Sequence, residues 1–397
     1  MRPFLALLLS AALAAAFALP AGAAATSSPD TPTAAAAQTA KATTVLVGVS
    51  DAHRQAVHQL AGYAVVNRIA AIGVDVVRVP KGSVSAALAV FRQIPQVRFA
   101  EPNRVVRLSA VPNDPHLRDQ YALTRIRARS GWADYGRLWR ATGGARLAVV
   151  DSGIDMYSPE FAGKVSHCRR WLTGVGIGAD GCQDTQFHGT HVAGIAAARA
   201  NNREGIAGVA FDSPIMALQA FNSTGTALTA DIAAAIVYAA NNGAKVANYS
   251  FSADLPSSAE REAVAFARSK GVVQVAAAGN TGEGKVQYPA GYPLVMAVSA
   301  TNARDQLASY SSYGPGTEVS APGTAILSTF PAGLYVRLDG TSMAAPHVAG
   351  LAALLRAQGY DARATRVRIR NQSDDLGAAG YDTRYGYGRI NMVRALD

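Results

Sequence analysis

"LAVVDSGID", residues 147–155, joins an apolar strand to a carboxylate. Its first four residues have the length and the continuous apolar composition of a strand that is covered on both faces. Asp151 follows directly, where the chain turns through Gly153. Burying an unpaired carboxylate is costly, so a side chain at this edge of a sheet needs a polar partner. We expect that partner to come from another segment of the chain.

Beyond Pro112, apolar strands alternate with helices. This alternation predicts an α/β fold, in which a parallel sheet carries helices on both faces. Ser257 and Glu260 can form a capping box at the start of one of the helices. In such folds the chemistry collects at the carboxyl ends of the strands. The expected strands are 147–150, 215–220, 246–250, 272–277 and 295–299, and the expected helices begin near residues 190, 229, 258 and 342.

Three further polar residues lie at the ends of these predicted elements. His188, in "HGTHVAG", opens a helix, and a neutral imidazole held by a carboxylate at one nitrogen can accept a proton at the other. Ser342, in "GTSMAAPHVAG", also opens a helix, whose dipole and free amide groups favour negative charge on an incoming oxygen. Asn280 ends the segment "AAAGN", and its amide can donate to that same oxygen.

The tetrapeptide HVAG follows both His188 and Ser342, at 191–194 and 347–350. Its small residues let a helix approach its neighbours closely. We therefore interpret HVAG as a packing element, and its histidines as structural residues of the two helices rather than catalysts. The chemistry lies in the residues that precede it.

Residues 43–107 show a different order of elements. The strands expected at 44–49, 64–69, 74–79 and 97–100 and the helices expected at 52–61 and 84–93 follow a βαββαβ order. That order predicts a small ferredoxin-like α+β module, which by itself indicates nothing about function.

The N-terminal residues indicate export. Residues 1–23 begin with Arg2, continue through an apolar stretch and close on Ala21-Gly22-Ala23, a pattern that signal peptidase accepts. About fifteen apolar residues are too few to span a bilayer comfortably. We expect a signal peptide, no membrane association after its removal, and a protein secreted to the exterior or the periplasm. Residues 24–42, rich in Ala, Thr and Pro, are expected to form a disordered spacer.

Charge and cysteine content narrow the possible partners. The chain has 37 basic and 27 acidic residues, of which the first 109 residues hold ten and four, leaving 27 and 23 in the remainder. That near balance, without a basic run, argues against a nucleic-acid partner. Export favours a disulfide between Cys168 and Cys182, the two cysteines of the chain, over two free thiols.

Four motifs in this order resemble the subtilisin family of serine proteases (the subtilases), and its thermitase-like members in particular. "VVDSGID", "HGTHVAG" and "GTSMAAPHVAG" are similar to the three catalytic signatures, and "AAAGN" is similar to the oxyanion segment. The resemblance implies a subtilisin-like catalytic domain at 110–397. It also implies a catalytic triad of Asp151, His188 and Ser342, with Asn280 holding the oxyanion.

In that family an inhibitory propeptide precedes the catalytic domain, and the module at 43–109 resembles it. The resemblance implies a zymogen whose propeptide assists folding, inhibits the enzyme and is cut off between about Ser109 and Asn113. We expect a secreted endopeptidase that acts on polypeptides as a monomer. The reaction proceeds through an acyl-enzyme and needs no catalytic cofactor.

The resemblance also implies a substrate cleft. The family binds an extended peptide between two strand segments, which correspond here to Gly225-Thr226-Ala227 and Ser250-Phe251-Ser252. The wall of the first specificity pocket corresponds to Ala277-Ala278-Gly279. Two positions depart from the family pattern, because Ser252 replaces a glycine at the mouth of the cleft and Phe187 replaces a glycine before the catalytic histidine.

A structural calcium ion is the metal that the resemblance suggests. Oxygen ligands suit calcium, and the matching positions are Asp114, Glu160 and Asn202. Glu160 stands in place of the usual aspartate, and its extra methylene can shift the carboxylate out of reach.

Two other interpretations stay open. Histidines three residues apart share a helix face, which would suit a metal hydrolase with ligands among Cys182, Asp184, His188 and His191. A chain with a subtilase fold can also be a catalytically silent binding protein. Asp155 and Asp184 flank the first two motifs, and we assign them structural, hydrogen-bonding roles.

Overall fold

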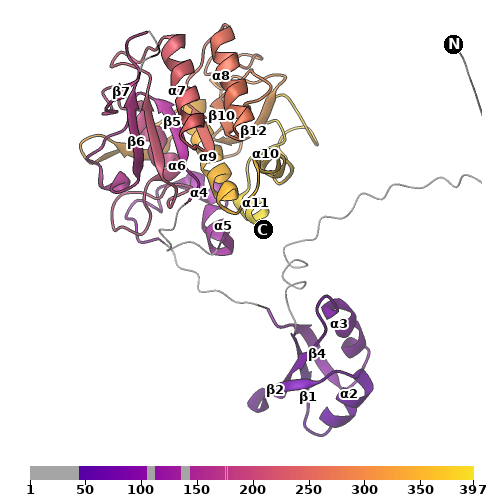
Figure 1. The fold of residues 1–397 in the computed structure, drawn as a ribbon. Coiled ribbons are helices and arrows are strands. Elements are labelled where there is room, and N and C mark those ends of the chain that lie inside the picture. Colours follow the sequence, from indigo (N-terminus) through magenta and orange to yellow (C-terminus); the bar gives the residue numbers. More distant parts are fainter. Residues whose placement is uncertain (1–43, 105–111, 136–143, 175, 177) are drawn as a thin grey trace, which may run out of the picture. The chain divides into compact units, whose positions relative to one another are not determined.

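The computed structural model describes residues 44–104, 112–135, 144–174, 176 and 178–397 (Figure 1). Its internal contacts divide the chain into two compact units, Met1–Val105 and Val106–Asp397. The predicted signal peptide, the spacer and most of the predicted processing region lie outside the described residues. No helix in the described ranges is long and apolar enough to cross a membrane.

The smaller unit is an antiparallel sheet with strand order β2-β3-β1-β4 and two main helices, as the ferredoxin-like prediction requires. Val47 and Val77 of the sheet share a buried cluster with Val57 of α2 and Phe91 of α3, so both helices cover the same face. Its elements are β1 (Thr44–Val49), α2 (Arg54–Ala61), β2 (Val65–Ile69), η1 (Ala70–Ile72), β3 (Val74–Arg78), α3 (Val84–Arg92) and β4 (Val97–Pro102).

The described part of the larger unit is built on an eight-stranded sheet with strand order β12-β11-β10-β9-β5-β8-β6-β7. All neighbouring strands are parallel except β6 and β7, which confirms the predicted α/β class. The elements are α4 (Tyr121–Arg125), α5 (Ala128–Tyr135), β5 (Leu147–Asp151), η2 (Pro159–Phe161), β6 (Val165–Arg170), β7 (Ala179–Asp180), α6 (His188–Ala197), β8 (Ile215–Gln219), α7 (Thr229–Asn241), β9 (Val246–Tyr249), α8 (Ser258–Ser269), β10 (Val273–Ala277), β11 (Met296–Thr301), β12 (Thr317–Pro322), β13 (Ile326–Phe330), β14 (Leu334–Leu338), α9 (Thr341–Ala357), α10 (Ala362–Asn371) and α11 (Met392–Leu396).

Alternate residues of β5 serve two different cores. Leu147 and Val149 belong to the cluster that contains α6 and α9. Ala148 and Val150 belong to the cluster that contains α7 and α8 on the other face. Side chains alternate between the two faces of a strand, so Asp151 at the end of β5 faces the α6 and α9 layer.

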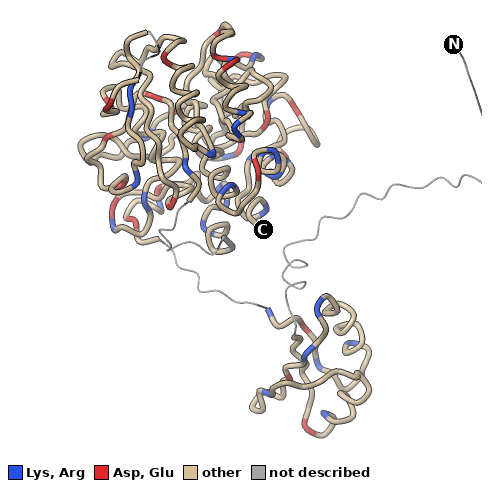
Figure 2. The backbone as a smooth tube through the Cα atoms, in the orientation of Figure 1, with Lys and Arg blue, Asp and Glu red and all other residues tan. Residues whose placement is uncertain are grey.

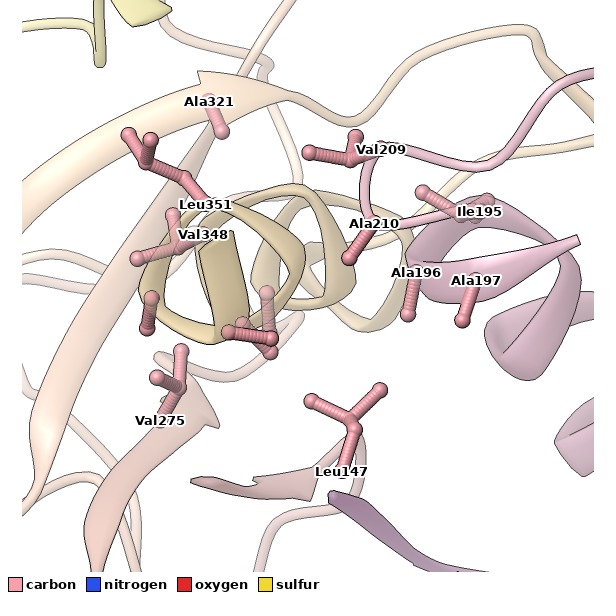
Figure 3. Close-up of a cluster of buried hydrophobic side chains, with 14 of the residues drawn as sticks. Leu147, Ile195, Ala196, Ala197, Val209, Ala210, Val275, Ala321, Val348 and Leu351 are labelled. Atoms are coloured by element: carbon pink, nitrogen blue, oxygen red, sulfur yellow. The ribbon is translucent and has the colours of Figure 1, made fainter. Parts of the chain in front are cut away.

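Helix α9 is the centre of the first core. Residues 341–355 of α9 are all buried, and Val348 and Leu351 lie among residues of two parallel strands, Val275 of β10 and Ala321 of β12 (Figure 3). A helix that is apolar on all sides is typical of a position inside the core rather than on the surface. Basic and acidic residues are interspersed along the described backbone of the larger unit, which shows no long run of one sign (Figure 2).

The repeated HVAG packs as predicted. A Cβ on Gly194 of α6 would collide with the hydroxyls of Ser328 and Thr329 in β13, and one on Gly350 of α9 would lie 2.6 Å from Val209 Cβ. Close approach therefore requires glycine at both positions. The two hydroxyls of β13 donate to backbone carbonyls of α6 at 2.7 Å, which fixes this strand on the helix.

Both HVAG histidines are buried and structural. His191 Nε2 lies 3.1 Å from Val336 O, and His347 Nδ1 lies 2.9 Å from Met343 O. Burial lowers the pKa of each imidazole to about 4. Neutral rings that donate to carbonyl oxygens satisfy the buried backbone without carrying charge.

Some local expectations need correction. Ser257 accepts from the Glu260 N–H at 3.3 Å, but the Glu260 carboxylate binds Tyr292 Oη, which also accepts from the Ser257 N–H at 2.9 Å. Only half of the predicted capping box therefore forms. The β13–β14 hairpin was not predicted, although Pro331 and Gly333 between two short apolar runs are typical signals of a tight turn.

Cys168, on β6, and Cys182 form the predicted disulfide, with a Cα–Cα distance of 5.0 Å. Neither cysteine is therefore available as a metal ligand. The bridge closes the segment that leads from β6 toward α6.

Gly194→Ala is expected to lower the free energy of unfolding by about 1–3 kcal/mol, because the new methyl group must displace two hydroxyls of β13. Gly284→Ala is the matched control, since Gly284 is exposed and the nearest atom to its added Cβ lies at 3.7 Å. Denaturant unfolding of both variants, made on a Ser342→Ala background to exclude proteolysis, measures the difference. Equal effects at the two glycines would contradict the packing role of HVAG.

Candidate active site

The Asp151 carboxylate contacts His188, which comes from another segment of the chain, as its buried position at the end of β5 led us to expect. The carboxylate is 3% exposed, and its Oδ1 accepts from the Ser152 N–H at 2.7 Å and lies 2.8 Å from His188 Nδ1. Its Oδ2 is buried without a hydrogen-bond partner. The carboxylate thus fixes the orientation of the imidazole by its Nδ1 edge, and Nε2 is the nitrogen left for chemistry.

His188 is the first residue of α6, and its side chain is 27% exposed. The Gly189 N–H donates to Ser152 Oγ at 2.8 Å, which ties the start of the helix to the end of β5. Burial alone would lower the pKa of His188, but the charge and hydrogen bond of Asp151 and the charge of Asp184 outweigh it and raise that pKa above its usual value. The ring is therefore basic enough to take up a proton.

Asp184 caps α6, in agreement with its predicted structural role. Its Oδ1 accepts from the N–H groups of Gln186 and Phe187 at 3.0 and 2.7 Å, and its Oδ2 accepts from Thr190 N at 2.8 Å and from Thr190 Oγ1 at 2.6 Å. Sequence reasoning missed its electrostatic effect on His188. A carboxylate four residues before the first residue of a helix that opens with a reactive histidine could have signalled it. Asp155, also predicted to be structural, accepts from the Tyr157 N–H at 3.1 Å.

Ser342, near the start of α9, is held by Ser250 in two ways. Its Oγ donates to the Ser250 carbonyl at 2.9 Å, and the Ser250 hydroxyl donates to the Ser342 carbonyl at 2.8 Å. The second bond is possible because Pro346, four residues on, has no N–H to offer that carbonyl. The Ser250 hydroxyl was a missed positioning group, and a proline inside the predicted helix was the available signal.

Asp151 ends β5, and Ser250 and Asn280 follow β9 and β10, so all three lie at the carboxyl ends of adjacent parallel strands. A cavity of about 160 Å³ opens there, lined by Asp151, Ser152, Gln186, His188, Phe221, Gly225, Ser250 and Phe251. Ser342 is hydrogen-bonded to Ser250. The predicted acid, base and nucleophile (Asp151, His188 and Ser342) therefore lie at one edge of the sheet. Among the hydrogen bonds of the described residues, none joins Ser342 Oγ to His188 Nε2.

The orientation of the Asn280 amide follows from its partners. Thr341 N and Thr341 Oγ1 both donate to Asn280 Oδ1 at 2.9 Å. A backbone N–H can only donate, so the atom facing it must be the amide oxygen. The Asn280 side chain is exposed, and its NH₂ group is the end left to bind a ligand.

The predicted cleft residues divide into three groups. Gly225, Ser250 and Phe251 line the cavity, and Ser252 is exposed. Thr226 is already engaged in a turn, since its N–H donates to Asn222 Oδ1 at 3.1 Å and its carbonyl accepts from Asn222 N at 3.0 Å. That backbone is not free for the pairing expected of it. Ala278 and Gly279 are buried, and both accept or donate backbone hydrogen bonds within the protein.

The predicted calcium ligands also come together, although with different partners from those expected. Asn202 donates its amide to Glu160 Oε2 at 3.1 Å, and Glu160 Oε1 accepts from Ile206 N at 2.9 Å and Tyr335 Oη at 3.0 Å. Asp114 Oδ1 is buried without a hydrogen-bond partner. Burial raises the pKa of both carboxyl groups, and the charge of Asp114 adds to the rise at Glu160.

Two segments of the chain match known protein families. Residues 142–388 match the model of the subtilase family, Peptidase_S8. The chain belongs to the subtilase family. Residues 29–103 of this subtilase match the fervidolysin N-terminal prodomain. The protein is a serine-type endopeptidase with an N-terminal prodomain.

Named relatives of this subtilase cover most of its length. It is 40% identical over 319 residues to the thermophilic serine proteinase of Bacillus sp. (strain AK1), which is 79% of this chain and 76% of the relative. It is 40% identical over 286 residues to thermitase of Thermoactinomyces vulgaris, covering 72% of this chain and 99% of thermitase. A solved protease from Pseudoalteromonas arctica PAMC 21717 superimposes with a TM-score of 0.66 at 27% identity, covering 72% and 99% of the two chains.

The metal-hydrolase interpretation loses its ligands in this subtilase. Cys182 is in the disulfide, His188 Nδ1 is bonded to Asp151, and His191 Nε2 is bonded to Val336 O. The described residues contain no group of three or more His, Cys, Asp or Glu side chains arranged to hold a metal.

Asp184→Asn is expected to lower the pKa of His188, because it removes one of the charges that raise that pKa. The acid limb of the kcat/KM profile reports the base of the free enzyme, so it should move to lower pH. Asp155→Asn is the matched control, since Asp155 is equally buried but does not contribute to the His188 pKa. An upward shift, or equal shifts in the two variants, would contradict the electrostatic role of Asp184.

Proposed function

We propose that this subtilase hydrolyses peptide bonds of extended polypeptides with Ser342 as nucleophile, His188 as general base and then acid, and Asp151 as the group that orients and supports His188. The observation that carries the proposal is the 2.8 Å contact between Asp151 and His188, beside a serine bonded to the wall of the same cavity. The reaction needs no cofactor, because the nucleophile, the base and the oxyanion donors all come from the protein.

The first chemical step requires a rotation of the Ser342 side chain. Its hydroxyl donates to Ser250 O at rest, and a turn about the Cα–Cβ bond transfers that hydrogen bond to His188 Nε2. Catalytic hydrogen bonds commonly tighten only when substrate is bound. The Ser342 oxygen then attacks the peptide carbonyl, its proton passes to His188, and His188 delivers that proton to the departing amine. Water repeats the sequence on the acyl-enzyme and releases the acid.

The developing oxyanion is stabilised by two donors. One is the Asn280 NH₂ group, which the two bonds from Thr341 leave facing outward. The other is the Ser342 N–H, because the first N–H groups of a helix have no partner within it. Donors fixed before the reaction stabilise the transition state without reorganisation at that moment.

The substrate lies in extended form along Gly225 and the 250–252 segment, with Ala278 and Gly279 in the wall of the pocket before the cut. Because the N–H and carbonyl groups of Thr226 already bond to Asn222, fewer backbone groups beside Gly225 can pair with the substrate. Ser252, being exposed at the mouth, narrows the entrance with its hydroxymethyl group. We expect the enzyme to work as a secreted monomer with no nucleic-acid or membrane partner.

The prodomain, proposed at 43–109, acts as folding aid and inhibitor of the catalytic domain at 110–397. The sheet face opposite α2 and α3 carries Phe99, which is 41% exposed over Gly48 and therefore leaves apolar surface uncovered within the described unit. An exposed apolar sheet face is typical of a surface that docks on another element. Autoprocessing near 109–113 frees the mature enzyme, and the signal peptide at 1–23 directs secretion.

Calcium would be held by Asp114 and Glu160, with Asn202 beside them, and would supply structural stabilisation rather than chemistry. Asp114 and Glu160 are buried carboxylates with no ion-pair partner among the described residues, and one oxygen of Asp114 accepts no hydrogen bond. This arrangement fits a cation that prefers oxygen ligands. The present bonds of Glu160 to Asn202 and Tyr335 leave Asp114 as the better-suited ligand.

Ser342→Ala should abolish hydrolysis of peptide substrates and leave the chain at full length, whereas the parent loses its prodomain. Asn280→Ala should retain about a hundredth to a thousandth of the parent kcat, as expected for one oxyanion donor. Gel analysis of processing and peptide kinetics measure both effects. A Ser342→Ala variant that still cuts would exclude the proposed nucleophile, and a folded parent without peptidase activity would support the silent binding protein instead.

Calcium at a hundred times its Kd should raise the free energy of unfolding by about 2.7 kcal/mol. Thermal unfolding of Ser342→Ala in calcium and in excess chelator measures the difference without autolysis. Asp114→Asn should remove most of the calcium effect, while Asp180→Asn, an exposed carboxylate on β7, should keep it. Equal melting temperatures with and without calcium would exclude the site.

A further inference from the structure

Phe187, directly before His188, has a strained backbone. Its φ is +77°, in the left-handed region that is costly for any residue with a Cβ. Phe187 is the N-cap of α6, and its side chain makes no capping hydrogen bond. Its ring is 42% exposed. Strain retained beside a reactive residue points to a use for the side chain that it carries.

The ring of Phe187 packs on Phe330. The two ring centroids are 5.2 Å apart and their planes are inclined by 55°. Phe330 is half-buried at the end of β13, and the preceding Thr329 anchors that strand to the Thr190 carbonyl of α6 at 2.7 Å. The β13–β14 hairpin then continues into α9, which carries Ser342. The aromatic pair therefore spans the two segments that supply the proposed base and the proposed nucleophile.

Neither Phe187 nor Phe330 is among the residues that line the cavity beside His188. Gln186 lines that cavity together with Gly225 and Ser250, and its Oε1 accepts from the His188 N–H at 3.2 Å. Phe187, the next residue, does not line the cavity and contacts Phe330 instead. A peptide extended along Gly225 must cross His188 to be cut. On the proposed function the peptide fills this cavity before the cut, so its leaving segment continues outside the cavity, past His188 and the adjacent Phe187.

The geometry points to Phe187 and Phe330 as a binding surface for an apolar side chain of the leaving segment, just after the cleaved bond. This inference rests on the proposed function and adds the substrate class, namely peptides with an aromatic or large aliphatic residue on that side. Exposed aromatic faces bind such side chains through area burial and ring stacking. This surface determines which residues are preferred after the cleaved bond. The cavity determines which residues are preferred before it.

Aminolysis of the acyl-enzyme isolates this surface, because the added amine occupies only the leaving side. A peptide ester first acylates Ser342 and releases its alcohol. The nitrogen of an amino-acid amide then attacks the acyl carbon, the new C–N bond forms as the C–Oγ bond breaks, and the proton lost by the nitrogen passes through His188 to the Ser342 oxygen. Water competes for the same intermediate, so the product ratio measures amine binding independently of acylation.

The experiment compares phenylalaninamide with glycinamide as acceptors in the mature enzyme. The parent should favour phenylalaninamide, and Phe187→Gly should reduce that preference about five- to tenfold. Phe187→Tyr, which keeps a ring, should restore the preference to within about twofold of the parent. Phe330→Ala should reduce it as Phe187→Gly does. Tyr157→Ala removes another exposed aromatic ring, at 88% exposure, and should leave the ratio at the parent value.

A preference that is unchanged in Phe187→Gly, in an enzyme that still hydrolyses the ester, would overturn the inference alone. The same holds if Tyr157→Ala lowers the preference as much as Phe187→Gly does. A parent that forms neither hydrolysis nor aminolysis product would overturn the proposed function and, with it, this inference. Thermal unfolding of each variant confirms that it is folded, and the Phe330→Ala variant carries the test if the glycine variant is not folded.

Discussion

The alternation of side chains along β5 is the constraint on which the site depends. Leu147 and Val149 face the core that holds α6 and α9, so Asp151, two residues on, must face the same layer. A shift of one residue would point the carboxylate toward the layer of α7 and α8 and away from His188. The apolar residues that bury the strand thereby also aim the acid at His188.

Buried helices impose a second constraint on the reactive residues. Because α6 and α9 lie inside the core, His188 and Ser342 can reach the cavity only from the first turns of their helices. The first turns of both helices are held by hydrogen bonds to residues outside the helices. Asp184 accepts from the Thr190 N–H of α6, Asn280 accepts from the Thr341 N–H of α9, and Ser250 donates to the carbonyl that Pro346 leaves free. Each support also bears on the chemistry, because it fixes a charge, a donor or the nucleophile.

The same arrangement explains the strained backbone of Phe187. Residue 187 must end the Asp184 loop and start a buried helix within one residue, which places its backbone in the left-handed region. Asp184 and the β13 contacts stabilise that turn against the strain. The ring is thereby directed toward Phe330 and away from the cavity, so one strained residue separates the two sides of the proposed cleavage point.

The sequence alone determined the class of the fold, because apolar runs of strand length alternating with helices admit few packings, and it determined which residue types stand at the ends of those elements. Local patterns also sufficed for the packing role of HVAG. Only the tertiary structure decided the contacts between distant segments. These are the contact of Asp151 with His188, the two hydrogen bonds between Ser250 and Ser342, the hydrogen bonds that occupy the Thr226 backbone, and the ring contact of Phe187 with Phe330. The physical reason is that hydrogen-bond partners and ring contacts across 92 residues, as between Ser250 and Ser342, depend on distances that no local periodicity contains.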